Sequence, residues 1–120
     1  MSDYRKLKVW GLAHDLALDT HRVAMHIRGR HHYSLQSQLV RAASSIPANI
    51  VEGRAKDSDK DFARFLGYAV ASASELEYHI VLVRDLGLVT LNDANTLLGQ
   101  VTTVSKMLNA LRAKLRGPTA

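Results

Sequence analysis

The sequence predicts an all-α protein, an antiparallel up-down-up-down four-helix bundle. Three observations support this: apolar residues recur at helical spacing in four segments, glycines stand where those segments should end, and the connections are too short to cross a bundle. Helices joined by short connections lie side by side and antiparallel. We expect one domain over residues 1–120. The expected helices cover residues 6–28, 35–53, 58–86 and 91–116.

The first two segments each have one apolar side, as a helix packed in a bundle requires. The apolar side of the first segment carries Trp10, Ala13, Ala17, Ala24 and Ile27, flanked by Val9, Leu12, Leu16 and Val23. That of the second carries Leu35, Leu39, Ala42, Ile46 and Ile50. Because glycine readily adopts the left-handed conformation that ends many helices, we expect Gly29 to close the first helix and Gly53 to mark the end of the second.

Pro47 lies inside the second segment. A proline in a helix interior removes a hydrogen bond and clashes with the carbonyl four residues back, here that of Ala43, at a cost of ~3 kcal/mol. Because the apolar spacing continues through Pro47, we expect a helix that is kinked there; a break into two helices is the alternative. Ser44 or Ser45 could bond the freed carbonyl.

The third and fourth segments show the clearest periodicity, with apolar residues at alternating steps of four and three. In the third these residues are Phe62, Leu66, Ala69, Ala73, Leu76, Ile80 and Val83. In the fourth they are Ala94, Leu98, Val101, Val104, Leu108, Leu111 and Leu115. Ser58 and Thr90 are expected N-caps, since each precedes a carboxylate by three residues. Gly87 and Gly117 are expected at the helix ends.

Composition limits the function classes. The chain has no cysteine, which excludes a disulfide framework and a thiolate metal site. No segment reaches the ~18 apolar residues of a membrane span, and the charged N-terminus lacks an apolar run of signal length. We expect a soluble cytoplasmic protein with no membrane partner. The 16 lysines and arginines exceed the 11 acidic residues, for a formal charge of +5, which suits an acidic partner.

The charge is concentrated at one end of the predicted bundle, where the first and third helices start and the second and fourth end. The positive residues expected there are Arg5, Lys6, Lys8, Arg54, Lys56, Lys60, Arg64, Arg112, Lys114 and Arg116. The negative ones are Asp3, Glu52, Asp57, Asp59 and Asp61. Such a cluster would bind nucleic-acid phosphates in a salt-dependent way. The alternative is ordinary solubilising charge, and cations also suit the C-terminus of the fourth helix.

A second candidate nucleic-acid site is the turn from Arg28 to Tyr33, at the opposite end. It combines Arg28 and Arg30 with two histidines and a tyrosine that could stack on an unpaired base. The same alternative of solubilising charge applies to it.

Four polar residues share one side of the second helix at steps of four, four and three. They are Arg41, Ser45, Asn49 and Glu52. By periodicity alone this stripe is a solvated face. If it were buried, it would pair with the third helix and fix the register of the two helices. In that case Arg41 would lie near Ser72 and Glu75, and Glu52 near Lys60 or Arg64.

The third helix is apolar on more than its core side, which indicates self-association. A helix that is apolar all round is normally buried all round, whereas a single bundle leaves one side of each helix in water. We expect a homo-oligomer, with a monomer that exposes scattered apolar residues as the alternative. The candidate interface residues are Phe65, Tyr68, Tyr78, Val81 and Leu82.

Signals for catalysis are weak, and we predict no catalytic residues, no metal site and no cofactor. His14 and His21 lie two helical turns apart, too far to share a metal easily. Glu75 and Glu77 point to different sides of the helix, which argues against a pair of catalytic carboxylates. The Arg-x(4–6)-His motif of all-helical ribonucleases is also missing.

The stretches QLVRAASSIPANIVEG, DSDKDFARFL and ASASELE, with a Trp on the first helix, resemble the bacterial four-helix-bundle family of 23S rRNA-intervening-sequence proteins over about Tyr4 to Val89. The matching positions are Arg41, Ser45, Pro47, Asn49, Glu52, Gly53, Ser58, Phe62, Phe65, Glu75 and Glu77. The turn RGRHHYSL departs from the family, which tends to carry a proline, an acidic residue and Tyr-Gly-Leu there, and Val51 replaces a common alanine.

The resemblance implies a homopentameric ring of bundles, a link to RNA and no established catalytic activity. A related accessory protein of diversity-generating retroelements binds a reverse transcriptase and nucleic acid. The sequence therefore favours a non-enzymatic, homo-oligomeric RNA-binding protein. The alternative is a scaffold or adaptor that recruits a partner protein without touching nucleic acid.

Overall fold

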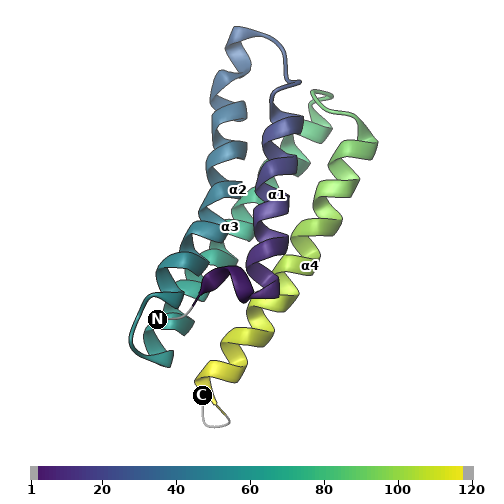
Figure 1. Ribbon diagram of the computed structural model, residues 1–120. Helices are drawn as coiled ribbons and strands as arrows, with labels where there is room; N and C mark the ends of the chain where they lie inside the picture. Colours follow the sequence, from purple (N-terminus) through teal and green to yellow (C-terminus); the bar gives the residue numbers. More distant parts are fainter. Residues whose placement is uncertain (1–2, 118–120) are drawn as a thin grey trace.

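Four α-helices form the computed structural model, which describes residues 3–117 (Figure 1). Each helix runs antiparallel to the next; α1 and α3 both pack against α2 and α4. The molecule measures 47 × 24 × 20 Å. This arrangement confirms the predicted all-α bundle. The elements are the 3-10 helices η1 (Tyr4–Lys6) and η2 (Arg30–His32), and the α-helices α1 (Lys8–Ala24), α2 (Tyr33–Arg54), α3 (Asp59–Asp85) and α4 (Leu91–Arg116).

The first helix is shorter than predicted. It ends at Ala24, and Gly29, with φ of 96°, lies in the following connection and does not cap it. After the helix the backbone hydrogen bonds span three residues instead of four: the His26 amide donates to the Val23 carbonyl, and the Ile27 amide donates to the Ala24 carbonyl. Ile27 is still buried, because this turn directs its side chain back onto the core. The apolar pattern of the sequence therefore extends to Ile27, three residues beyond the end of α1.

Gly53 does not end the second helix, which continues to Arg54. A Cβ atom at residue 53 would lie 2.8 Å from the Cβ of Phe65 and 2.9 Å from the Cδ1 of Phe62. Real Cβ atoms do not approach other atoms so closely, so glycine is needed for α2 and α3 to come together here. The predicted role in helix termination was wrong; Gly53 allows close packing of two helices.

The second helix continues through Pro47, so the alternative of a break is wrong. Figure 1 shows the lower half of α2 leaning away from the direction of its upper half. The hydroxyls of Ser44 and Ser45 donate to the carbonyls of Arg41 and Ala42, at 3.2 and 2.8 Å. Neither bonds the carbonyl of Ala43, which faces the proline, so that expectation was wrong. Pro47 itself is buried.

The predicted helix caps at the other ends are confirmed. The hydroxyl of Ser58 accepts from the Asp61 amide at 3.1 Å, and that of Thr90 accepts from the Asp93 amide at 3.0 Å. Gly87 and Gly117 follow α3 and α4 with φ of 74° and 77°. These caps fix where the two longest helices start and stop.

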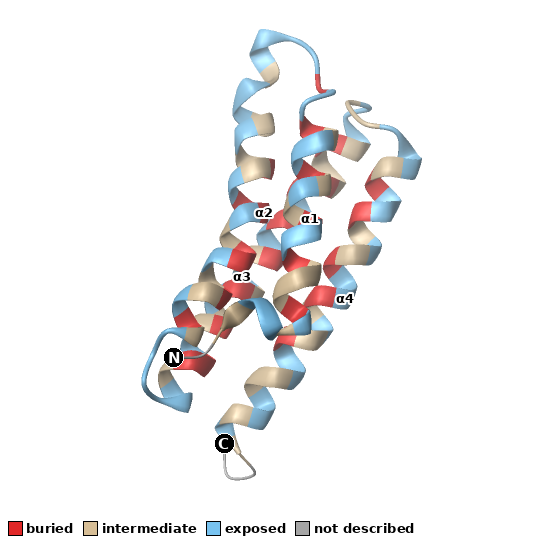
Figure 2. Ribbon diagram, viewed as in Figure 1, coloured by how far each residue is buried: buried red, intermediate tan, exposed pale blue. Residues whose placement is uncertain are grey.

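The core follows the inner sides of the four helices (Figure 2). All seven residues of the predicted α3 seam are buried. On α1, Ala13 and Ala24 are buried as predicted, whereas Trp10 and Ala17 are half-buried and their neighbours Val9 and Leu16 are buried. On α4, Leu97 is buried and the predicted Leu98 is half-buried. The rotation of each helix about its own axis, which decides the residues it buries, is set by the helices that it packs against.

Candidate nucleic-acid interface

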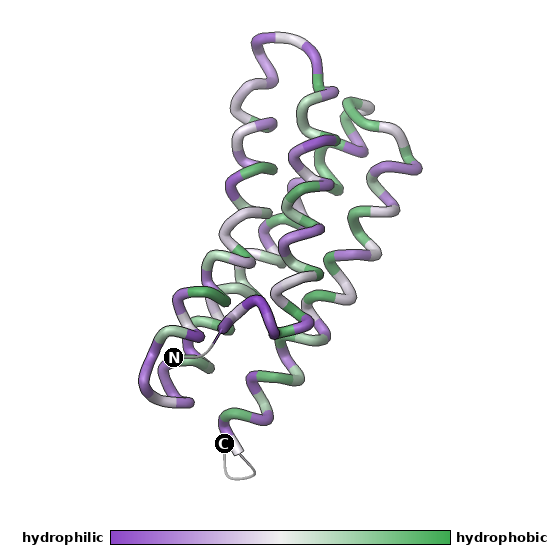
Figure 3. Tube along the Cα trace, in the orientation of Figure 1, coloured by the Kyte–Doolittle hydropathy of each residue, from purple (hydrophilic) through white to green (hydrophobic). Residues whose placement is uncertain are grey.

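One end of the bundle gathers the start of α1, the end of α2, the start of α3 and the end of α4 (Figure 1). This is the arrangement that concentrates the charge as predicted. Figure 3 shows hydrophilic residues running through η1 and through the connection between α2 and α3 at this end. We call this end the basic pole; its cations are Arg5, Lys6, Lys8, Arg54, Lys56, Lys60, Arg64, Arg112, Lys114 and Arg116.

A groove of about 470 Å³ lies at the basic pole, between the first turns of α3 and the last turns of α4. Lys60 and Arg64 line it from α3, and Arg112 and Arg116 from α4. Asp61 is the one acidic residue among its lining residues, and Ala63 and Leu115 supply apolar surface. Two predicted binding residues of α4, Arg112 and Arg116, therefore line the same groove as two cations of α3 that lie about 50 residues earlier in the chain.

Arg112 lies half-buried against α3. A Cβ atom at Gly67 would lie 3.2 Å from the Nη2 atom of Arg112, so the guanidinium rests directly on the glycine. Its Nη1 atom donates to the side chain of Asn109 at 3.4 Å, and its buried Nε has no hydrogen-bond partner. No carboxylate within residues 3–117 forms an ion pair with Arg112. The guanidinium is therefore held in place with donors to spare for an anion.

Arg64 faces the same groove from α3. It donates to the hydroxyl of Tyr68 at 3.1 Å and forms an ion pair with Asp61 at 3.4 Å. The Tyr68 hydrogen bond, followed by the Asp61 carboxylate, raises the pKa of Arg64 above its ordinary value. Its guanidinium also lies 4.9 Å from the ring centroid of Phe65. Arg64 is exposed, and its guanidinium is effectively always protonated.

Two aromatic residues support further cations at the basic pole. The guanidinium of Arg54 lies 5.6 Å from the ring centroid of Phe62, and the ammonium of Lys56 lies 5.0 Å from that of Phe65. Such contacts are worth about 0.5–1 kcal/mol at exposed sites. Phe65, a candidate interface residue, is half-buried and lies close to two cations, those of Lys56 and Arg64.

The remaining predicted binding residues of the basic pole are exposed. Arg5 lies 3.8 Å from Asp3 and 5.1 Å from the ring centroid of Tyr4. For Lys6, Lys8, Lys114 and Arg116 there is no ion pair within the described part of the chain.

The second predicted site lies at the opposite end, in the connection between α1 and α2. Arg28, Arg30 and His31 are exposed, and Tyr33 is 62% exposed. The rings of His31 and His32 lie 4.0 Å apart. Because Gly29 has no side chain, the His31 ring folds back against it. The structure brings these residues together in one turn, separate from the basic pole.

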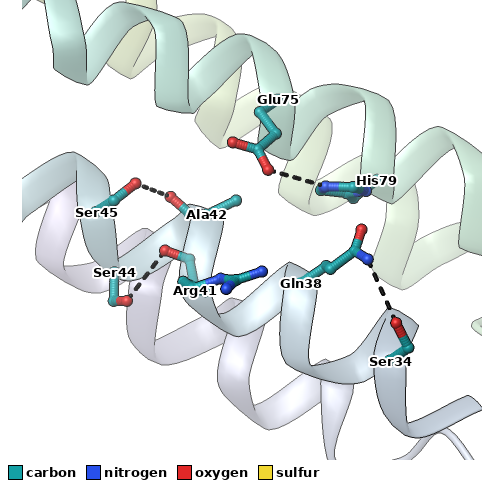
Figure 4. Close-up of polar contacts among 8 residues, drawn as sticks. All are labelled: Ser34, Gln38, Arg41, Ala42, Ser44, Ser45, Glu75 and His79. Atoms are coloured by element: carbon teal, nitrogen blue, oxygen red, sulfur yellow. Dashed lines mark hydrogen bonds and ion pairs between the residues drawn. The ribbon is translucent and has the colours of Figure 1, made fainter.

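The polar stripe of α2 does not pair with α3 as the buried alternative required. Arg41 and Glu52 are exposed, and the amide of Asn49 donates to the Ser45 carbonyl of its own helix at 2.8 Å. The carboxylate of Glu75 instead lies 3.3 Å from Nε2 of the buried His79, as Figure 4 shows. Within residues 3–117, Arg41 and Glu52 form no ion pair. The stripe is a largely solvated face.

The candidate interface residues on α3 leave apolar surface in water. Tyr68 is 46% exposed and Tyr78 60% exposed, whereas Val81 and Leu82 are half-buried. One copy of the chain therefore does not cover the outer side of α3.

No group of three or more histidine, aspartate or glutamate side chains within residues 3–117 is arranged to hold a metal ion. The family residues Glu75 and Glu77 are both exposed. Among the helices described, none has the length and apolar character to cross a bilayer.

The fold and the charged end define a four-helix-bundle protein with one basic pole. The family model of the 23S rRNA-intervening sequence protein matches residues 5–110, so the chain belongs to this family. The match includes most of α4, which the resemblance noted in the sequence did not reach.

A solved structure gives independent support for the fold. The crystal structure of a protein of unknown function from the S23 ribosomal protein family of Bacteroides thetaiotaomicron superimposes with a TM-score of 0.81. It is 23% identical, and the match covers 87% of this chain and 97% of that one. No curated protein matches the chain.

Proposed function

We propose that this protein is a non-enzymatic, cytoplasmic RNA-binding protein that acts as a homo-oligomer. The observation that carries the proposal is the groove between α3 and α4, where Lys60, Arg64, Arg112 and Arg116 face a single carboxylate. A row of cations with few acidic partners suits a phosphate backbone, because each phosphate it neutralises releases a condensed counterion.

Self-association would multiply this groove. The exposed rings of Tyr68 and Tyr78 give the outer side of α3 the apolar surface of an interface. We propose a pentamer, the state that the family resemblance implies, in which the basic poles repeat around one face. Several weak grooves on one particle would bind a long RNA with an avidity well above that of one groove.

Filter binding of structured ribosomal RNA across a salt series tests the proposal. Wild-type protein should retain RNA with a steep salt dependence. The double variant Arg112→Ala/Arg116→Ala should bind more weakly, with a slope of log K against log salt reduced by about 2, since each lost phosphate contact removes about 0.9. Lys106→Ala is the matched control, because Lys106 is exposed on α4 outside the groove. An equal loss in the control, or no retention by the wild type, would refute the groove as the binding site.

A protein-interaction scaffold is the second candidate function, favoured by the exposed tyrosines of α3. Such an adaptor would assemble and bind a partner protein while retaining no nucleic acid. Sedimentation combined with the filter assay separates the two: assembly without retention supports the scaffold, and assembly with salt-dependent retention supports RNA binding.

A further inference from the structure

Three aromatic rings, which we call the stack, lie in contact where η1 meets α1, and two of them are parallel. The ring of Tyr4 meets that of Trp10 edge-on, with centroids 5.0 Å apart and planes at 66°. The ring of His14 lies parallel to Trp10, with centroids 4.9 Å apart and planes within 8°. Trp10 packs against the core, whereas His14 is exposed. The stack thus has an anchored inner ring and an outer ring in water.

The stacking contact with Trp10 orients the His14 ring. Within residues 3–117 its side chain makes no hydrogen bond and no ion pair. An exposed planar ring that is already aligned by a neighbour offers a flat surface for another planar group. Purine and pyrimidine bases stack on such surfaces irrespective of their sequence.

Three cations lie close to the stack in the sequence. Arg5 lies over the ring of Tyr4, and Lys6 and Lys8, at the end of η1 and the start of α1, are exposed without ion pairs in the described residues. Both parts of an unpaired nucleotide therefore find a partner here: aromatic rings for the base, and ammonium groups for the flanking phosphates.

We propose that the Tyr4–Trp10–His14 stack binds an unpaired base of single-stranded nucleic acid, with the base lying on the outer face of His14. This rests on the proposed function and specifies it, because it predicts a preference for single strands over duplexes. In a duplex the bases are stacked on one another and present only their edges, so no ring face is available to His14. The basic pole would still bind duplex phosphates without that preference.

Trp10 is the only tryptophan in the chain, so its fluorescence reports on this stack alone. We would titrate the full-length protein with a short unstructured RNA, with the same strand annealed to its complement, and with single-stranded DNA of the same sequence. The single strands should change the emission of Trp10, and the duplex should bind with little change. Equal changes with single strand and duplex would overturn the proposal; a response to RNA and none to DNA would assign a further contact to the 2′-hydroxyl.

His14→Ala tests the stacking surface directly. Base–aromatic stacking at the strength seen in other proteins corresponds to about a 5- to 150-fold change in affinity. We expect a single-strand affinity at least about fivefold weaker, with duplex affinity unchanged, measured by anisotropy of labelled strands. His21→Ala is the matched control, since His21 is an exposed histidine two turns further along α1 and stacks on no ring among the described residues.

The outcomes separate the two proposals. If the protein binds duplex and single strand equally and His14→Ala binds as the wild type does, the stacking proposal fails and the proposed function stands. If neither nucleic acid binds, both fail. Helical circular dichroism of His14→Ala, which should match the wild type because the residue is exposed, checks that the variant folds.

Discussion

Gly53→Ala should destabilise the bundle, although alanine is the better helix former. The new Cβ would lie 2.8 Å from the Cβ of Phe65 and 2.9 Å from the Cδ1 of Phe62. The Cβ of Phe65 cannot rotate away, because it is fixed to the α3 backbone, so the two helices must separate. Such overpacking typically costs about 1–3 kcal/mol.

The change also brings a gain, which must be subtracted. Replacing glycine by alanine within a helix stabilises by about 0.5–1 kcal/mol, because the unfolded chain loses conformational freedom. The expected net loss in the free energy of unfolding is therefore about 0–2.5 kcal/mol. Chemical denaturation followed by circular dichroism measures this value through the midpoint and slope of the transition.

Gly99→Ala provides the matched control with the opposite sign. Gly99 also lies inside a helix, but a Cβ there would meet nothing within 4 Å. We expect this variant to gain about 0.5–1 kcal/mol. If Gly53→Ala gained stability as Gly99→Ala should, the close approach of α2 and α3 at Gly53 would be wrong.

Three further changes test the helix starts, the proline and the core by the same denaturation measurement. Ser58→Ala should cost about 1 kcal/mol, because the Asp61 amide loses its cap; an unchanged midpoint would contradict the cap. Pro47→Ala should raise the free energy of unfolding by about 1 kcal/mol. The helix-propensity gain of ~3 kcal/mol exceeds the ~1.6 kcal/mol lost when two buried methylenes are removed. A loss of stability would refute this balance. Leu76→Ala, at a fully buried position of α3, should cost about 2–5 kcal/mol, whereas Leu91→Ala, at a 67% exposed position, should change stability by less than about 0.5 kcal/mol.

The basic pole was predictable in part. The helix order and the short connections determine which helix ends lie together, so the concentration of lysine and arginine at one end of the bundle follows from the sequence. The sequence does not show which of these cations line the same groove. Lys60 and Arg64 meet Arg112 and Arg116 only because α3 and α4 pack closely enough for Arg112 to rest on Gly67.

The sequence by itself determined the features that depend on residues three or four positions apart. Spacing specified the buried side of α3, and the serine and threonine caps specified where α3 and α4 begin, because both act within one or two helical turns. Tertiary structure decided the rest: the end of α1 at Ala24, the burial of Leu97 in place of Leu98, and the contact role of Gly53. These depend on how far each helix rotates and how closely it approaches its neighbours, which side chains distant in the sequence set by packing together.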